Sequence, residues 1–149
     1  MIASEMHEGY LSLSLALAAV ILPSVTLGCS QGDGIPRYRV SGTVTFGGNP
    51  VPAGMIYFNP DMKKGNNGPP GFAEISAGRF DTASKGSRHV IAGAHEVVIE
   101  GHDPGPANGV SEASGRRLFG GYRVPLDLPA AASQHTFEVP AEASRQMAN

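Results

Sequence analysis

The amino-acid sequence predicts an all-β protein whose body, residues 37–140, is an antiparallel β-sandwich of about seven strands. Short segments alternate nonpolar and polar residues with a period of two, which is typical of half-buried strands. The 149-residue chain contains 20 Gly and 12 Pro, which interrupt helices and occupy turns. Beyond residue 28, no segment has the periodicity of an amphipathic helix. Because each sheet must bury one face, two packed sheets are the expected arrangement.

The first half of the body contains two predicted strands and an exposed loop. Residues 38–46, YRVSGTVTF, alternate along their whole length and form the first strand. The turn sequence GGNP follows at 47–50, and residues 54–59 form the second strand. Residues 62–70 are rich in Lys, Gly, Asn and Pro, so we expect an exposed loop there.

The middle of the body is predicted to contain a hairpin and a central strand. Residues 71–75 and 79–82 flank Ser-Ala-Gly, a spacing typical of a tight hairpin. In the connector that follows, Val90 and Ile91 are candidates for a short buried piece. Residues 94–101, AHEVVIEG, alternate strongly and predict the next strand.

The C-terminal part is predicted to hold the longest loop and the last strand. The loop covers residues 102–117, and residues 118–122 form a short edge segment after it. Residues 134–139 predict the final strand, since their nonpolar positions share one face. Residues 141–149 are polar, and we expect a disordered tail there.

The N-terminal 28 residues are predicted to be a removable signal peptide. Residues 11–22 form an apolar run that fits a signal-peptide core and is shorter than the roughly 20 residues of a membrane-spanning helix. Residues 1–9 depart from the usual pattern, because they contain two Glu and no Lys or Arg. Residues 29–36 are Gly-rich, and we expect them to form a flexible tether.

The end of this leader, VTLGC at residues 25–29, resembles the lipobox of bacterial lipoproteins. The resemblance implies cleavage between Gly28 and Cys29 and a lipid on Cys29. Thr26 lies where Leu is commonest in that family, and Ser30 after the cysteine favours an outer-membrane destination. The alternative is that Cys29 is an ordinary residue near the cleavage site. As the only cysteine, it cannot form an internal disulfide.

Residues 40–60, VSGTVTFGGNPVPAGMIYFNP, resemble the start of carboxypeptidase regulatory-like domains. The matching positions are Gly42, Val44, Gly48, Pro50, Val51, Gly54 and Phe58. Residues 78–80 and 93–99 resemble a turn and a strand of the same domains. The resemblance implies a transthyretin-like (prealbumin-like) sandwich in a small exported bacterial lipoprotein, and it says almost nothing about activity.

Four glycines are candidates for structural roles: Gly42, Gly54, Gly78 and Gly93. We expect Gly42 at a packed bend and Gly54 at a bulge or a close approach of two backbones. Gly78 suits a positive φ in the hairpin. None of these roles involves chemistry.

The histidines beyond the leader show no metal-binding pattern. They are His89, His95, His102 and His135. No two have the His-x-x-x-His spacing of a helical zinc site, and no cysteine or carboxylate cluster completes a ligand set. His102 with Asp103 is the best remaining candidate pair, whereas we expect His95 to pack at the start of a strand. We therefore predict no metal and no cofactor.

Other residue patterns that carry chemistry are also missing from the sequence. Glu96 and Glu100 would lie roughly 13 Å apart along a strand, beyond the roughly 5–9.5 Å of paired glycosidase carboxylates. Asp61, Asn66 and Asn67 share a loop, but without the order of EF-hand ligands. The chain has no Gly-x-Ser-x-Gly elbow and no phosphate-binding glycine motif. We therefore expect a protein that is not an enzyme.

The charge balance argues against nucleic-acid binding. The chain has 11 basic and 13 acidic residues. Because Glu5 and Glu8 lie in the leader, the remainder carries no net charge. Nucleic-acid binding needs a concentrated basic face, which this composition does not provide.

Together these observations predict a non-catalytic, lipid-anchored protein of the cell envelope with a structural or protein-interaction role. Its membrane contact would be the lipid anchor, and an envelope protein or a glycan would be its other partner. The alternative is a module that binds a glycan or small ligand through the loops at 62–70 and 102–117.

Overall fold

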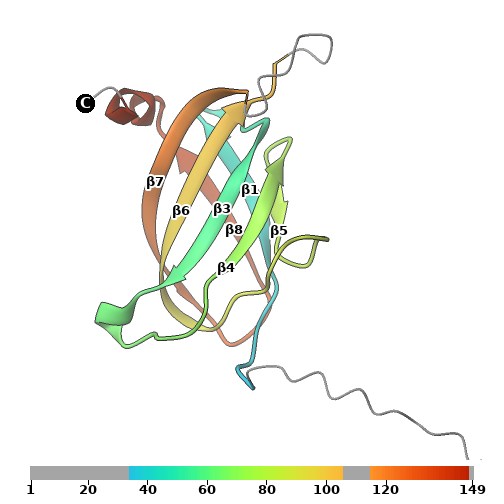
Figure 1. The fold of residues 1–149 in the computed structure, drawn as a ribbon, viewed down its shortest axis with the longest axis vertical. Coiled ribbons are helices and arrows are strands. Elements are labelled where there is room, and N and C mark those ends of the chain that lie inside the picture. Colours follow the sequence, from blue (N-terminus) through green and yellow to red (C-terminus); the bar gives the residue numbers. More distant parts are fainter. Residues whose placement is uncertain (1–33, 106–114, 148–149) are drawn as a thin grey trace, which may run out of the picture. The chain divides into compact units, whose positions relative to one another are not determined.

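The computed structural model describes residues 34–105 and 115–147, which belong to one compact unit, Gly32–Asn149. The described residues form an all-β domain with two short 3-10 helices and no α-helix (Figure 1). Neither of these helices is long and apolar enough to cross a membrane. The predicted signal peptide, together with Gly28 and Cys29, lies outside the described residues.

Eight strands lie within the described residues. They are β1 (Val40–Phe46), β2 (Asn49–Pro50), β3 (Ala53–Pro60), β4 (Gly71–Ser76), β5 (Arg79–Asp81), β6 (Gly93–Asp103), β7 (Arg116–Leu128) and β8 (Ser133–Val139). The 3-10 helices are η1 (Met62–Lys64) and η2 (Ala141–Met147). All strands except β2 and β7 begin and end within two residues of their predicted bounds. The predicted buried piece at residue 90 is an isolated bridge between Val90 and Tyr38.

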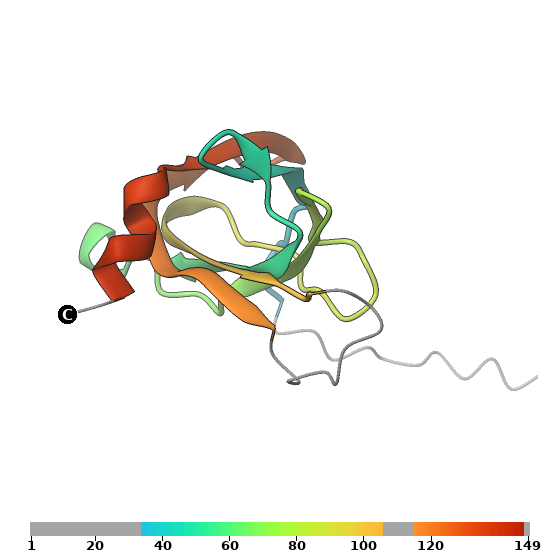
Figure 2. The ribbon, with the colours of Figure 1, turned by 90° about the horizontal axis from the view of Figure 1, so that it is seen from above.

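Hydrogen bonds join the strands into one sheet with the order β2-β1-β5-β4-β3-β6-β7. β8 lies off this path and pairs with β1. All pairs are antiparallel except β1 and β8, which run parallel from Val40 opposite Ser133 to Phe46 opposite Val139. Seen from above, the sheet curls round on itself (Figure 2). The prediction of an all-β, largely antiparallel fold is confirmed.

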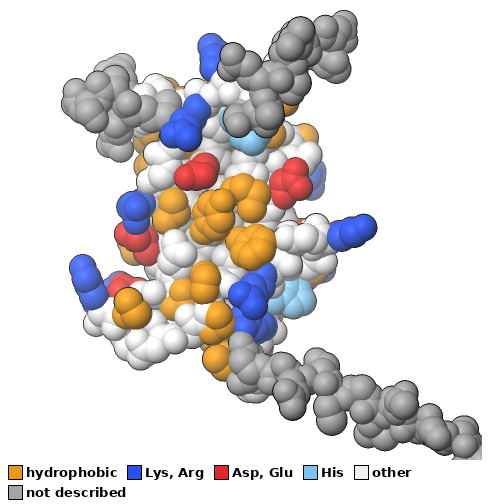
Figure 3. All heavy atoms as spheres, in the orientation of Figure 1, with side chains coloured by type: hydrophobic (Ala, Val, Ile, Leu, Met, Phe, Trp, Pro, Cys, Tyr) orange, Lys and Arg blue, Asp and Glu red, His pale blue; other side chains and the backbone are white. Residues whose placement is uncertain are grey.

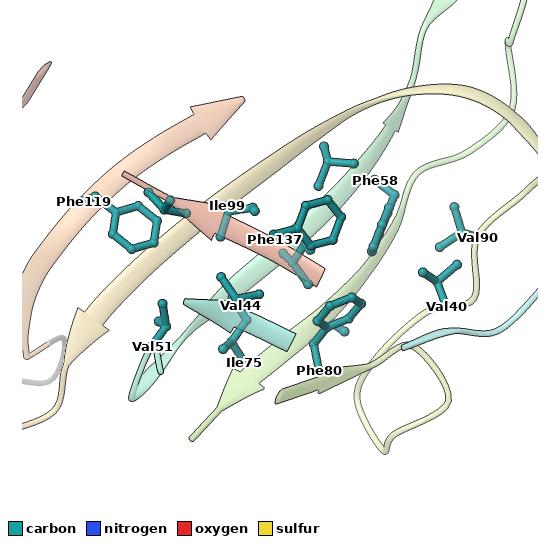
Figure 4. Close-up of a cluster of buried hydrophobic side chains, with 14 of the residues drawn as sticks. Val40, Val44, Val51, Phe58, Ile75, Phe80, Val90, Ile99, Phe119 and Phe137 are labelled. Carbon is teal, nitrogen blue, oxygen red and sulfur yellow. The ribbon is translucent and has the colours of Figure 1, made fainter. Parts of the chain in front are cut away.

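The hydrophobic core fills the inside of the curl. Its members include Val44, Ile56, Phe58, Ile75, Ile99 and Phe119, each fully buried (Figure 4). The rings of Phe46 and Phe119 lie 5.0 Å apart between centroids, which brings β1 against β7 across the interior. Phe80 similarly contacts Phe58 and Phe137. Because every member of this core cluster lies between Val40 and Ala143, the unit has a hydrophobic core of its own.

β7 is much longer than the edge segment predicted at residues 118–122. It pairs with β6 from Asp103 opposite Arg116 to Gly93 opposite Leu128, with irregular register around Gly101. The predicted loop at 102–117 is correspondingly shorter, since strands reach into it from both ends. The second half of β7 was not predicted because it contains Pro125, and proline is excluded from central strands. It is tolerated here because β7 is an edge strand.

The tail also differs from its prediction, because residues 141–147 form η2. Ala143 is only 6% exposed and belongs to the core cluster. η2 packs against β7, so the segment after β8 reaches the opposite edge of the curled sheet (Figure 2). Residues 141–149 mix three alanines and one methionine with polar residues, without a periodic pattern that could have predicted this packing.

The four candidate structural glycines lie where backbones come close or turn. A Cβ on Gly42 would overlap the carbonyl oxygen of His135, and a Cβ on Gly54 would overlap that of Glu100. Any side chain at these positions would push neighbouring strands apart. Gly78 has a φ of +74° in the β4–β5 turn, and Gly93 has a φ of +101° at the start of β6.

Candidate interaction surface

A row of side chains crosses the outer face of the sheet from one segment to the next. The row consists of Arg88, Phe72, Tyr57, Val98 and Arg123, which are cross-strand neighbours in that order. Directly opposed residues of a sheet share a face, with Cβ atoms roughly 5 Å apart. These five residues, here called the outer row, therefore place two aromatic rings and one valine between two guanidinium groups.

The period-two pattern of β3 decides which aromatic ring faces outward. Ile56 and Phe58 are fully buried in the core, whereas the residues that alternate with them, Met55 and Tyr57, are partly exposed on the outer face. β4 does the same, since Ala73 and Ile75 face the core and Phe72 lies outside. The alternation in the sequence thus predicts the outward direction of Tyr57, but it does not predict that Phe72 lies beside it.

Two carboxylates border the nonpolar part of this face. Met55 lies opposite Glu74 on one side and opposite Glu100 on the other. Both glutamates are exposed, and two strand spacings of roughly 5 Å place their backbones about 10 Å apart. Figure 3 shows hydrophobic side chains over β6, β3 and β4, with acidic side chains on both sides. Among the described residues, neither glutamate forms an ion pair.

Arg123 at the end of the outer row is held in place by Glu96. Its Nη1 donates to Glu96 Oε2 over 2.6 Å, and both side chains are about half exposed. A surface pair of this kind contributes little to stability. The pair does fix the direction of the guanidinium. It also engages Glu96, which with Glu100 was the candidate carboxylate pair in the sequence.

A polar groove of about 540 Å³ lies on the same face, beyond β4. β5 and β1 supply half of its lining residues, including Ser41, Thr43 and Arg79, and Glu74 lines its border with the outer row. The Arg39–Asp81 ion pair, 2.5 Å between Nη2 and Oδ2, lies in this wall. Hydrogen bonding to Arg39 holds the pKa of the Asp81 carboxyl below its usual range. Among the described residues that line the groove there is no histidine to act as a base for its hydroxyls.

The candidate histidines do not come together into a site. His89 is exposed in the connector before β6, His102 lies near the end of β6, and His135 lies on β8. Asp103 is 3.8 Å from Arg116 in an exposed ion pair. Within residues 34–105 and 115–147, no three His, Cys, Asp or Glu side chains are grouped so that they could hold a metal ion.

His95 packs at the start of β6, as expected. Its ring is 2% exposed, and Nδ1 lies 2.7 Å from the carbonyl oxygen of Gly93. Because a carbonyl only accepts, Nδ1 is the donor and Nε2 carries the lone pair. Nε2 is buried and has no hydrogen-bond partner among the described residues. Burial lowers the pKa of this histidine.

Two polar side chains next to η1, those of Asp61 and Asn66, have structural roles. The Asp61 carboxylate accepts from the Lys63 amide over 3.0 Å and so caps η1. The Asn66 amide donates to the carbonyl oxygens of Ala92 and Ala94, which ties the loop to the start of β6. These side chains are therefore already engaged within the domain.

Comparison with known proteins does not identify a function for this surface. No protein-family model matches the chain, and no curated protein matches it. The likeness to carboxypeptidase regulatory-like domains therefore remains a prediction from the residues that carry it.

Proposed function

We propose that this protein is exported, is anchored by a lipid on Cys29, and works without catalysis as an envelope protein that binds another protein. The outer row carries this proposal. It places two neighbouring aromatic rings on the solvent side of central strands, where a purely structural sheet needs no such side chains. Ser133 Oγ and His135 Nε2 lie 3.2 Å apart, but both residues belong to β8 and not to the outer row, so binding fits this face better than catalysis.

The composition of the face suggests the chemistry of its partner. Tyr, Phe, Met and Arg are enriched in protein interfaces, which combine a nonpolar centre with a charged rim. Tyr57 and Phe72 supply the centre, and Glu74 and Glu100 supply an acidic border that forms no ion pair with the described residues. The expected partner is a protein surface that presents a nonpolar side chain to the rings and a Lys or Arg between the two glutamates.

We also propose that the domain is a transthyretin-like β-sandwich of the carboxypeptidase regulatory-like type. The support is the motif between residues 40 and 60, together with the packing of Phe46 on β1 against Phe119 on β7. Contacts between strands that are not neighbours are what two facing layers require.

The alternative is a glycan or small-ligand module, and the polar groove of Ser41, Thr43 and Arg79 is the observation that favours it. The two loops first considered for this role belong to opposite ends of the sheet. η1 follows the end of β3 that pairs with His95, whereas Asp103 ends β6 at the other end. Roughly 26 Å of strand separates His95 from Asp103, the positions on β6 from which the two loops extend.

Site-specific photo-crosslinking tests the protein partner. Benzoylphenylalanine is placed at Phe72 in the full chain, in cells of its native host, and at the exposed Thr136 on β8 as the control. The expected result is a discrete protein adduct from position 72 and none from position 136. The double charge reversal Glu74→Lys with Glu100→Lys should abolish the adduct, whereas Glu138→Lys with Glu142→Lys should leave it intact.

Equal adduct yields at the two positions, or an adduct that survives reversal of Glu74 and Glu100, would count against the proposal. A glycan array probed with residues 32–149 separates the alternative. Binding to a glycan that is lost in Ser41→Ala with Arg79→Ala would move the function to the groove.

A further inference from the structure

Large hydrophobic side chains are exposed at one end of the domain. Among the described residues, the large hydrophobic side chains that are exposed are Ile35, at 39%, and Met62, at 75%. Ile35 lies next to the first described residue, and Met62 begins η1. Single exposed nonpolar residues are ordinary on protein surfaces. Two large ones at the same end of the domain, Ile35 and Met62, call for a physical explanation.

A shared cleft shows that the two segments lie together. The cleft, of about 370 Å³, is lined by Ile35, Pro36 and Tyr38 on one side and by residues 66–68 of the loop after η1 on the other. Its lining is mainly nonpolar and includes Ile91 and Ala92. In Figure 1, η1 and the start of the described chain both lie at the lower end of the sheet.

The exposed methionine is presented on a firmly held turn. Asp61 caps the N-terminus of η1, and Gly65 ends it with a φ of +83°. Asn66 then anchors the loop to the carbonyl oxygens of Ala92 and Ala94. Met62 thus projects from an ordered element rather than from a loose loop, so its exposure is a built feature of this end.

Two lysines accompany the methionine. Lys63 and Lys64 are exposed and form the last turn of η1. Among the described residues they take part in no ion pair. The nearest acid in sequence, Asp61, is engaged in capping the helix. A nonpolar side chain beside unpaired lysines is the combination that binds the interface of an anionic bilayer, through partial insertion and electrostatic attraction.

We propose that this end of the domain, with Ile35, Met62, Lys63 and Lys64, rests directly on a bilayer that contains anionic phospholipids. The position of the end in the chain supports this occupant. Four residues lie between Cys29 and Gly34, and the five steps of chain from one to the other span at most roughly 18 Å. A lipid on Cys29 would hold this same end near the membrane. The proposal therefore complements the anchor of the proposed function, but it is tested without that lipid.

The chain has no tryptophan, so one introduced residue reports on the contact without background. The probe is Met62→Trp in residues 32–149, which contain the whole core and no lipidated cysteine. Vesicles of equal parts phosphatidylglycerol and phosphatidylcholine should shift its emission to the blue, and brominated lipids should quench it. Lys85→Trp, at an exposed position by the polar groove, should show neither change. Unchanged emission from Met62→Trp would overturn the proposal.

Vesicle flotation of the same unit measures the charge contribution. Each lysine near an anionic surface contributes a factor of about five to binding. Lys63→Ser with Lys64→Ser should therefore weaken partitioning roughly 30-fold, whereas the matched pair Arg79→Ser with Lys85→Ser should change it less than about twofold. Equal losses in both pairs would overturn the proposal, because they would indicate attraction by overall charge.

These outcomes are distinct from failure of the proposed function. A missing photo-adduct at position 72 rejects the protein partner and leaves the membrane contact standing. Unchanged emission from Met62→Trp rejects the membrane contact and leaves both the partner and the lipid anchor standing.

Discussion

At the scale of single residues, His95 is the clearest case of a side chain whose protonation opposes the fold. Its Nδ1 hydrogen is committed to the carbonyl oxygen of Gly93, and its Nε2 lies in the interior without a partner. A second proton on Nε2 would place a charge where no acceptor is available among the described residues. The low pKa of His95 follows from this burial.

His95 should make stability depend on pH. Because the folded state lowers its pKa below the ordinary 6.5, the unfolded chain binds the proton more readily. The stability that neutral His95 contributes to the folded state is complete above about pH 6.5. It is lost as the pH falls from there through the folded-state pKa. Urea unfolding between pH 5 and 8 should therefore show a smaller loss of stability toward acid for His95→Gln than for the unchanged protein. The exposed His89→Gln should keep the original slope, and parallel curves for all three proteins would contradict the assignment.

At the scale of elements, the accuracy of the sequence prediction follows the strength of the alternation. β1, β3 and β6 alternate cleanly, so their bounds could be predicted. β7 could not be predicted because Pro125 and the glycine pair before Tyr122 imitate a turn, although an edge strand tolerates them. The outer row escaped prediction for a different reason. Tyr57, Phe72 and Val98 are far apart in sequence, and only the register of three strands brings them together.

η2 should contribute measurably to stability through one small side chain. Ala143 is nearly fully buried against the core, whereas Ala141, two residues earlier, is exposed. Ala143→Asp would place an unpaired charge at the core and should cost about 1 to 3 kcal/mol in chemical denaturation. The matched change Ala141→Asp should stay within roughly 0.5 kcal/mol of the unchanged protein. If the two variants have equal stability, η2 is not part of the folded core.

At the scale of the whole molecule, the outer row and the tethered end divide the surface into two regions. The outer row lies across the middle of the sheet, and Ile35 and Met62 lie at the end where the described chain begins. A domain that rests on a membrane by that end would leave the outer row free beside it. The sequence predicted the anchor at Cys29, but the two regions depend on side chains that only the folded sheet brings together.

Attachment to the membrane should depend on Cys29. Cells that express the full chain and grow with radiolabelled palmitate should label it, and Cys29→Ala should remove the label, because the thiol is the acceptor of the lipid. Cys29→Ala should also release the protein from the tightly bound membrane fraction, whereas Ser30→Ala should keep both label and attachment. An unlabelled protein that stays soluble would show that Cys29 is an ordinary residue.

The parallel pairing of β1 with β8 has a consequence for how the chain is made. Thr43 and Thr136, which face each other in this pair, are 93 residues apart. At a synthesis rate of about 5 to 20 residues per second, β8 is synthesised roughly 5 to 20 seconds after β1. During that interval one edge of β1 has unsatisfied amide and carbonyl groups, which can recruit another nascent chain. Aggregation of the nascent chain should therefore be most probable until β8 has been synthesised and has paired with β1.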